Sequence, residues 1–353
     1  MKKLLKLLAV LLLLLFVFVL YTVVTTGSFR SIEGSYSGNI TEVDIVGAED
    51  FAIDREAGFM IISSADRAGV RDGKSTLNGL YYMDLIDGQD NPKALLTGGE
   101  SELYPHGISM IRLDSNSHRL LVINHPITGE SQTHQIDEYI LRNQQLTHVQ
   151  THKDDLIISP NDVVAVDETS FYYTNDHGST SKWGLFAEDY MGLRRSNVVY
   201  SNGTNYSVVA DNIAYANGIN YDHDRQLLYV ASPRDFLVKV YNSKEDGTLD
   251  FQTDINCNSG VDNIEFDENG KLWIGSHPKL LSFSSYAAGS SEIAPSEIVT
   301  IDYHSPDQYE VDSIYENDGS HMSASTVAIP YNNKIYVGNV MDDHFIVLDQ
   351  SLL

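Results

Sequence analysis

One two-strand pattern recurs six times between residues 49 and 339, and this repeat restricts the possible folds more than any other feature of the sequence. In each copy a polar cluster precedes a short apolar strand, a polar turn and a second β-rich strand that ends in small or polar residues. The copies follow one another at intervals of 45–61 residues, and weaker strands such as 80–85 and 237–241 lie between them. A repeat of this length is typical of a propeller blade. The sequence therefore predicts an all-β fold, a six-bladed β-propeller.

The residues that begin each copy form the first candidate site. The innermost strands of a propeller run beside its axis, so these residues should meet at one end of the central channel. They are mostly carboxylates and amides: Glu49, Asp50, His106, Asn161, Asp162, Asn217, Asp262 and Asn263. A single Asn-Asp pair is usually turn chemistry, but such groups at the same position of four blades indicate a shared site. Carboxylate and amide oxygens favour Ca²⁺ over zinc or copper.

The composition agrees with a cation site and excludes other kinds of site. The chain has 49 acidic and 23 basic residues, with a formal net charge of −26. A field of that sign repels phosphate backbones, so no nucleic-acid partner is expected. Cys257 is the single cysteine, so neither an intramolecular disulfide nor a thiolate metal cluster can form. We expect Cys257 to be a small, inert core residue.

Two histidines should lie near the channel mouth. His106 begins the inner strand of the second blade, and His125 follows the second strand of the same blade. A pair of imidazoles beside a cation can supply a general base, because the pKa of imidazole lies close to neutral pH. The other ten of the 12 histidines have no such placement.

The N-terminus is predicted to be an uncleaved signal-anchor. Three lysines within the first six residues precede an almost unbroken apolar run over residues 7–24. That run is near the lower limit for spanning a bilayer and long for a cleavable signal peptide, and no small-residue cleavage site follows it. The positive-inside rule places the lysines in the cytoplasm. We therefore assign residues 1–26 to a membrane segment and residues 27–353 to an exported propeller domain. The alternative is a cleaved signal peptide and a secreted protein.

One segment, residues 180–195, breaks the strand pattern. Aromatic and apolar side chains recur there with helical spacing, at Trp183, Phe186, Tyr190 and Leu193. Two arginines at the end of the segment suit a helix C-terminus. We expect a short helix on the propeller rim beside the channel mouth, and a substrate lid or a membrane-facing helix is the alternative.

Short motifs are spread over the whole exported part. They include Pro105-His106-Gly107, Asn124-His125-Pro126, Pro160-Asn161-Asp162, Ala216-Asn217-Gly218, Val261-Asp262-Asn263 and Leu272 to Pro278. None of these motifs is decisive alone, but together and in this order they are specific, and they resemble the serum paraoxonase/arylesterase family.

The resemblance implies a six-bladed propeller with two calcium ions in its channel, one catalytic and one structural, and hydrolysis of lactones and aryl esters. The ligands that it implies for the catalytic calcium are Glu49, Asn161, Asn217, Asp262 and Asn263. Those of the structural calcium, which would lie deeper in the channel, are Asp50 and Asp162, with the main-chain carbonyls of Ile108 and Val163. His106 would be the base and His125 its support. The expected partner is a small lactone or ester.

Departures from the family pattern leave alternatives open. Vertebrate members close the ring with a disulfide, which this chain cannot form, so we expect closure by pairing of residues 41–46 with 344–348. A sugar lactonase of the gluconolactonase type shares the calcium site but lacks the paired histidines. A non-enzymatic propeller, similar to strictosidine synthase, is disfavoured by the intact set of calcium ligands.

Overall fold

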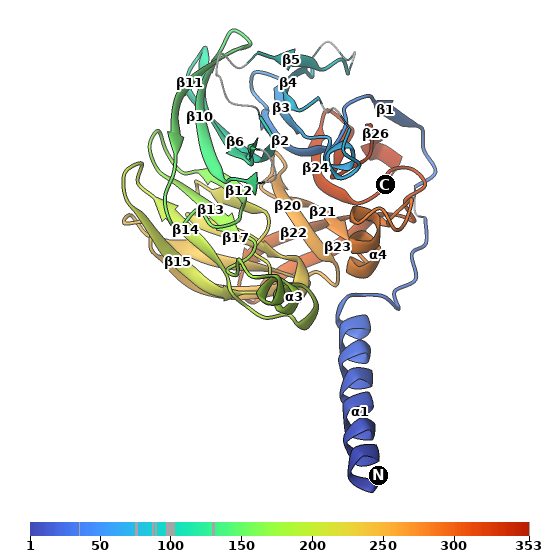
Figure 1. Cartoon of the computed structure of the whole chain (residues 1–353). Coiled ribbons are helices and arrows are strands. Elements are labelled where there is room, and N and C mark those ends of the chain that lie inside the picture. The colour runs from blue at the N-terminus through green and yellow to red at the C-terminus, as the bar shows by residue number, and fades with distance from the viewer. Residues whose placement is uncertain are drawn as a thin grey trace.

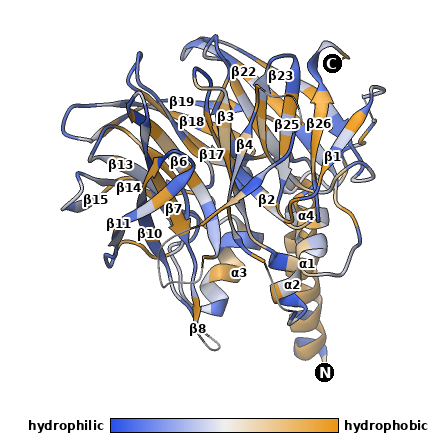
Figure 2. Cartoon of the chain, turned by 90° about the horizontal axis from the view of Figure 1, so that it is seen from above, coloured by the Kyte–Doolittle hydropathy of each residue, from blue (hydrophilic) through white to orange (hydrophobic). Residues whose placement is uncertain are grey.

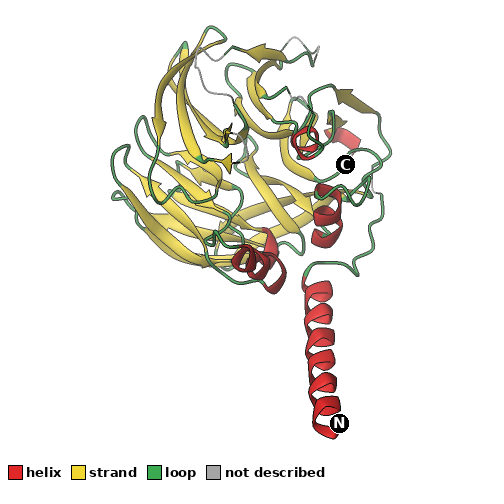
Figure 3. Cartoon of the chain, viewed as in Figure 1, coloured by secondary structure: helices red, strands yellow, loops and turns green. Residues whose placement is uncertain are grey.

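In the computed structural model the strands form six four-stranded antiparallel sheets around a central channel, which confirms the predicted six-bladed propeller (Figure 1). The structure describes residues 1–34, 36–74, 77–86, 88, 90–96, 103–128 and 131–352. Strands are the main regular structure of the propeller, and the long helix α1 (Lys2–Thr25) projects away from it (Figure 3).

Each blade begins with an inner strand beside the channel and ends with an outer strand. The first blade is β2 (Ala48–Asp54), β3 (Phe59–Ser64), β4 (Gly79–Asp84) and β5 (Lys93–Leu95). The second is β6 (Pro105–Asp114), β7 (Ser117–Asn124), β10 (Gln135–Arg142) and β11 (Gln145–His152), with a small hairpin, β8 (Ile127–Thr128) and β9 (Ser131–Gln132), between β7 and β10. The third is β12 (Pro160–Ala165), β13 (Phe171–Asn175), β14 (Ser196–Ser201) and β15 (Tyr206–Ile213).

The remaining three blades have the same order of strands. The fourth is β16 (Ile219–Asp222), β17 (Leu227–Ser232), β18 (Leu237–Ser243) and β19 (Leu249–Asn256). The fifth is β20 (Gly260–Phe266), β21 (Leu272–His277), β22 (Ser296–Ser305) and β23 (Gln308–Asn317). The sixth is β24 (Ser325–Tyr331), β25 (Lys334–Asn339), β26 (Phe345–Asp349) and β1 (Ile40–Val43).

The ring is closed by strand pairing between the two ends of the propeller, as the sequence predicts. β1 pairs with β26 in antiparallel register, with Thr41 opposite Val347 and Val43 opposite Phe345. The strand nearest the N-terminus therefore completes the blade that the C-terminus builds. β1 is the outermost strand of this blade, so hydrogen bonds between strands join the two ends of the propeller.

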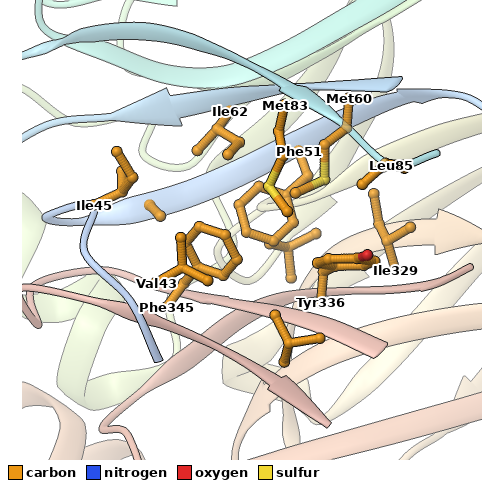
Figure 4. Packing of buried hydrophobic residues seen from close by; sticks show 13 residues of the cluster. Val43, Ile45, Phe51, Met60, Ile62, Met83, Leu85, Ile329, Tyr336 and Phe345 are labelled. Carbon is orange, nitrogen blue, oxygen red and sulfur yellow. The ribbon is translucent and has the colours of Figure 1, made fainter. Parts of the chain in front are cut away.

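The apolar core lies between neighbouring blades. Where the first and sixth blades meet, the rings of Phe51 and Phe345 pack edge to face with their centroids 5.4 Å apart (Figure 4). Met60, Met83 and Tyr336 surround this pair, and all five side chains are almost fully buried. Each such side chain contributes about 1.5–3 kcal/mol by its removal from water, so these contacts hold adjacent blades together around the channel. Cys257 is buried in a similar cluster, as expected.

Irregular pairing at the start of the inner strands shapes the channel. β2, β6, β12, β20 and β24 each show a register shift against their neighbouring strand near the channel mouth. A bulge lets consecutive residues of a strand face the same side instead of alternating. At Gly107 and Gly218 the blades approach so closely that a Cβ atom would collide with Asp162 and with the main chain at Asp262. The inner strands therefore carry their polar residues into a narrow channel.

The helices gather on the side of the propeller from which α1 projects (Figure 2). They are α2 (Arg67–Arg71), α3 (Lys182–Met191) and α4 (Leu280–Ala287), with two 3-10 turns, η1 (Pro233–Asp235) and η2 (Gln350–Leu352), elsewhere in the chain. α3 is shorter than the predicted 180–195. It ends at Met191 because Gly192 adopts a left-handed conformation, with φ of 66°. Leu193 and the two arginines that follow it therefore lie outside the helix.

The C-terminal end of α1 contacts the propeller, while the rest of the helix is exposed. Thr22 donates a hydrogen bond to the Tyr190 carbonyl at 3.2 Å, and the Leu280 amide donates to the Thr26 carbonyl at 3.0 Å. By its length and its apolar composition α1 is able to cross a membrane. A membrane-spanning α1 would hold the face of the propeller that carries α3 and α4 close to the bilayer.

Candidate functional site at the channel mouth

A cavity of about 390 Å³ opens at the channel end that α2, α3 and α4 surround. The inner strands and the turns before them supply its polar floor. Five of the predicted site residues line it: Glu49, His106, Asn161, Asn217 and Asp262. Residues that are up to 213 positions apart in the chain therefore meet in one place, and the propeller repeat brings them there.

Buried oxygens without partners converge on this floor. Asn263 donates a hydrogen bond from its Nδ2 to Glu49 Oε1 at 2.9 Å and another to the Glu49 carbonyl at 3.1 Å, which links the fifth blade to the first. Four side-chain oxygens in this group are buried and accept no hydrogen bond: Glu49 Oε2, Asn161 Oδ1, Asn217 Oδ1 and Asn263 Oδ1. An unsatisfied buried acceptor costs about 1–3 kcal/mol, so four of them in one group suit a site that binds a cation.

The chemistry of this group fits a hard divalent cation. Two carboxylates, Glu49 and Asp262, and three amides carry a formal charge of −2 with oxygen ligands only, which suits Ca²⁺. In the part of the chain that the structure describes, no group of three or more His, Cys, Asp or Glu side chains is placed to hold a metal ion. The five members of this set include no Cys and no His, the residues that most zinc sites use, and three of the five are amides.

The electrostatics of the group suit the binding of a cation. Burial raises the pKa of Glu49 to about 7, although Arg67 opposes the shift from 4.0 Å and the carboxylate of Asp262 adds to it. Asp262 accepts a hydrogen bond from His277 Nε2 at 2.8 Å. A cation between the two carboxylates would offset both the burial and their mutual repulsion.

Asp50 and Asp162 lie deeper in the channel than their neighbours Glu49 and Asn161. They line a second cavity of about 230 Å³, together with Ile108 and Val163. Asp50 accepts hydrogen bonds from the Phe51 and Ile108 amides, at 2.9 and 2.7 Å. Asp162 accepts from the Val163 and Ile219 amides, at 2.7 and 2.8 Å. The predicted residues therefore occupy two levels of the channel, which agrees with the two ligand sets that the resemblance implies, whereas the repeat alone placed all eight at one end.

The two buried carboxylates at this deeper level, Asp50 and Asp162, also favour a bound cation. Burial raises the pKa of Asp50 and of Asp162 well above the usual range, and the two carboxylates repel each other. The four main-chain amides only partly offset this cost. Each carboxylate oxygen keeps a second lone pair, so the pair also fits an oxygen-binding cation.

The predicted histidines are in contact with each other. His106 Nδ1 lies 3.1 Å from His125 Nε2, and His106 Nε2 lies 3.6 Å from Glu49 Oε1. Burial, followed by the charge of Arg67, lowers the pKa of His106 well below its usual value, and burial lowers the pKa of His125 to about 3. The expectation of an imidazole pKa near neutrality is therefore wrong for this environment. Both rings are neutral at neutral pH, which is the form that accepts a proton.

Several residues of the site have no signal in the sequence repeat. Arg67, on α2, lines the cavity, and its Nη1 is buried without a hydrogen-bond partner. His277 supports Asp262 as described above. Burial opposes a charge on His177, but hydrogen bonds to Asp176 and Asp189, at 2.8 and 2.9 Å, outweigh it and raise the pKa of His177 to about 10.

The wall opposite the polar floor is largely apolar. α4 supplies most of it, and Thr26, which follows α1, lines the cavity as well. The apolar members of this wall are Leu280, Leu281, Phe283, Ala287 and Val340. A cavity with a polar floor and an apolar wall is typical of a site for a small organic molecule.

Comparison with known proteins gives a consistent result. A family model described as Arylesterase matches residues 31–346. The chain is 32% identical over 303 residues to serum paraoxonase/arylesterase 1 of Homo sapiens, with 83% of each chain covered. It is 31% identical over 268 residues to serum paraoxonase/arylesterase 2 of Rattus norvegicus, with 74% of each covered.

Solved structures with low sequence identity share the propeller fold. A putative gluconolactonase superposes with a TM-score of 0.54 at 12% identity, covering 90% of this chain and 97% of that one. A calcium-binding protein, regucalcin, from Agrobacterium tumefaciens superposes with a TM-score of 0.52 at 11% identity, covering 90% of this chain and 95% of that one. At such identities the similarity is one of fold.

Proposed function

The chain belongs to the arylesterase family, and from this membership and the geometry of the channel mouth we propose that it is a calcium-dependent hydrolase of lactones and aryl esters. The observation that carries the proposal is the group of four buried, unpartnered oxygens on the channel floor, with a neutral histidine directly beside it. Family membership also makes a non-enzymatic propeller the weaker interpretation.

Five side chains would hold the catalytic calcium: Glu49, Asn161, Asn217, Asp262 and Asn263. When bound there, the cation would polarise the acyl carbonyl and stabilise the oxyanion that develops on it. Asp50 and Asp162, with the carbonyls of Ile108 and Val163, would hold a second, structural calcium one level deeper. Hydrogen bonds from main-chain amides fix both of these carboxylates, which suits a rigid structural site.

His106 would accept the proton of the attacking water. Its Nε2 faces the channel floor beside Glu49, and the ring is neutral, so a lone pair is available. His125 contacts Nδ1 of the same ring and thereby fixes its orientation. Arg67 contributes to keeping His106 in its neutral form, because a second positive charge close by is unfavourable.

The apolar wall of the cavity favours a substrate with an aliphatic or aromatic part. Leu280, Leu281 and Phe283 offer no hydrogen-bonding side chains to the many hydroxyl groups of a sugar lactone. The volume of about 390 Å³ suits a small lactone or a monocyclic ester. A gluconolactonase-type activity is therefore the second candidate, which the shared fold supports and the apolar wall disfavours.

We also propose that the propeller is exported and held at a membrane by α1. The charged residues before the apolar run would remain in the cytoplasm, and residues 27–353 would lie on the opposite side. The contacts of Thr22 and Thr26 with the rim would then place the channel mouth next to the lipid surface.

Hydrolysis by the purified full chain tests the proposed function. A panel of lactones, phenyl acetate and p-nitrophenyl acetate is assayed in calcium, in excess chelator, and after calcium is restored. We expect activity on several substrates that chelation abolishes and that calcium restores. Activity that persists in chelator would contradict the metal, and no hydrolysis of any lactone or ester in calcium would contradict the function itself.

A further inference from the structure

We propose that His134 is a relay residue, which carries protons between the catalytic base His106 and the solvent through His125. The proposal rests on the proposed hydrolase function and extends it, because His134 lies outside the calcium group and outside the cavity lining. It follows from a continuous chain of three imidazole rings in the second blade.

The three rings form one hydrogen-bonded chain from the channel floor to the surface. His106 Nδ1 and His125 Nε2 are 3.1 Å apart, and His125 Nδ1 and His134 Nδ1 are 2.9 Å apart. Both contacts are edge to face, with ring centroids 5.3 and 5.0 Å apart. His134 is partly exposed, and it lies just before β10. The chain therefore begins beside Glu49 and ends where water can exchange a proton.

Only two arrangements of protons satisfy both contacts when all three rings are neutral. In the first, His106 donates from Nδ1 to His125 Nε2, and His125 donates from Nδ1 to His134 Nδ1, which leaves His106 Nε2 free to act as a base. In the second, every bond is reversed and His106 carries its proton on Nε2. A neutral imidazole has one donor and one acceptor, so the two arrangements interconvert by the passage of one proton along the chain.

The relay accounts for each proton that is taken up or released when an ester is hydrolysed. As the water oxygen bonds to the acyl carbon, its proton goes to His106 Nε2, the Nδ1 protons of His106 and His125 each move to the next ring, and His134 releases its Nε2 proton to solvent. As the bond from the acyl carbon to the leaving oxygen breaks, that oxygen takes the proton from His106 Nε2. A proton from solvent then binds His134 Nε2, and the protons between the rings move back towards His106. No ring has to rotate.

Burial explains why a third ring is needed. The side chain of His106 is only 19% exposed and lines the cavity, so a bound substrate would separate it from bulk water. Transfer along the chain lets the proton leave through His134, which is partly exposed, instead of through the occupied cavity. A base that can pass its proton on does not have to store it in the buried channel.

Two substitutions of His134 distinguish a relay from a structural support. His134→Gln keeps a side chain that can hydrogen-bond His125 but cannot pass a proton through a ring. His134→Ala removes the ring and leaves space for a small solute. His304→Ala, on β22 and half-exposed beside Asp302, serves as a matched control that also loses a surface histidine.

The assay measures kcat and KM on phenyl acetate and p-nitrophenyl acetate in calcium, using the full chain. We expect both His134 variants to lose about 10-fold or more in kcat on phenyl acetate, with KM unchanged, which is less than the roughly 10²–10⁴-fold loss typical of removing the general base itself. The loss should be smaller on p-nitrophenyl acetate, whose leaving group needs no proton. Free imidazole should restore kcat in His134→Ala, and His304→Ala should behave like the wild type.

Two outcomes would overturn the relay. One is a His134→Gln enzyme with wild-type kcat on phenyl acetate, because a hydrogen-bonding support alone would then suffice. The other is a His134→Ala enzyme that is impaired but not rescued by imidazole while circular dichroism shows a native fold. Either result would leave the proposed function standing as long as the wild-type chain hydrolyses these esters in calcium.

Discussion

Replacement of Asn217 by alanine should change the stability of the protein in a direction that depends on calcium. Asn217 Oδ1 is buried and accepts no hydrogen bond, and an unsatisfied acceptor of this kind costs about 1–3 kcal/mol. In chelator Asn217→Ala removes that cost and leaves a small cavity in its place. The two effects oppose each other, so we expect the free energy of unfolding to change by no more than about 1 kcal/mol.

In saturating calcium the same substitution should destabilise the protein. A site that loses one of five side-chain ligands should bind calcium at least about tenfold more weakly, which corresponds to about 1.4 kcal/mol. Since calcium binds the folded state and stabilises it in proportion to the logarithm of its affinity, the loss appears directly in the free energy of unfolding. Asn217 is identified as a ligand if the substitution lowers the free energy of unfolding more in calcium than in chelator.

Asn175→Ala provides the control. Asn175 is as buried as Asn217, but its side chain is fully paired: Oδ1 accepts from the Ile158 and Ser159 amides, and Nδ2 donates to the Leu156 carbonyl and to Asn197. Its loss should cost about 2–4 kcal/mol in both buffers, because main-chain amides are left unpaired. Urea denaturation, monitored by tryptophan fluorescence, measures the free energy of unfolding of both variants in calcium and in chelator. If Asn217→Ala were equally destabilised in both buffers, the assignment of Asn217 to the metal would be refuted.

Three further predictions concern the ring, the outer strands and the anchor. Phe345→Ala should lower the free energy of unfolding by about 3–5 kcal/mol, because it empties a fully buried position where the first and last blades meet; urea denaturation checks it. Burial opposes ionisation of Glu138, but hydrogen bonds from His152 and Arg119 outweigh it and lower the pKa of Glu138 from 4.5 to about 2. The ionised Glu138 therefore stabilises the fold fully above about pH 4.5, and this stabilisation is lost as the pH falls towards 2. In Glu138→Gln the free energy of unfolding should fall by about 1–2 kcal/mol less over this pH range, a figure that allows for solvent screening. The exported protein should retain residues 1–26 and fractionate with membranes, and an N-terminal sequence that starts near residue 27 would contradict this.

The blade repeat made most of the fold predictable, because it is a property of spacing rather than of any single contact. Polar clusters at regular intervals predicted the number of blades and the residues at the channel mouth. The absence of a possible disulfide predicted closure by strands, which the pairing of β1 with β26 confirms. The helix end was missed although the sequence contained its signal, since Gly192 is the residue type that most readily stops a helix in the left-handed conformation.

The division of the channel into two levels could not be predicted from the repeat. Glu49 and Asp50 are consecutive in β2, and strict alternation would send only one of them into the channel. The register shift between Ala48 and Asp50 lets both face it, and the sequence has no clear marker for that shift. The distinction between a substrate-facing group and a deeper one is therefore a result of local strand irregularity.

Two of the residues that the sequence did not reveal, Arg67 and His134, share one physical property, which is that no strand of the repeat positions them. Arg67 lies on a short helix between blade strands, and His134 follows the β8–β9 hairpin. Strand periodicity fixes the direction of a side chain only within a strand, so neither could be placed from its distance to His106 or His125 in the sequence. Both nevertheless act on the same ring: Arg67 disfavours a charge on His106, and His134 completes the path by which a proton can leave it. The repeat therefore specifies where a cation is held, whereas the insertions between strands determine how the base beside it handles its proton.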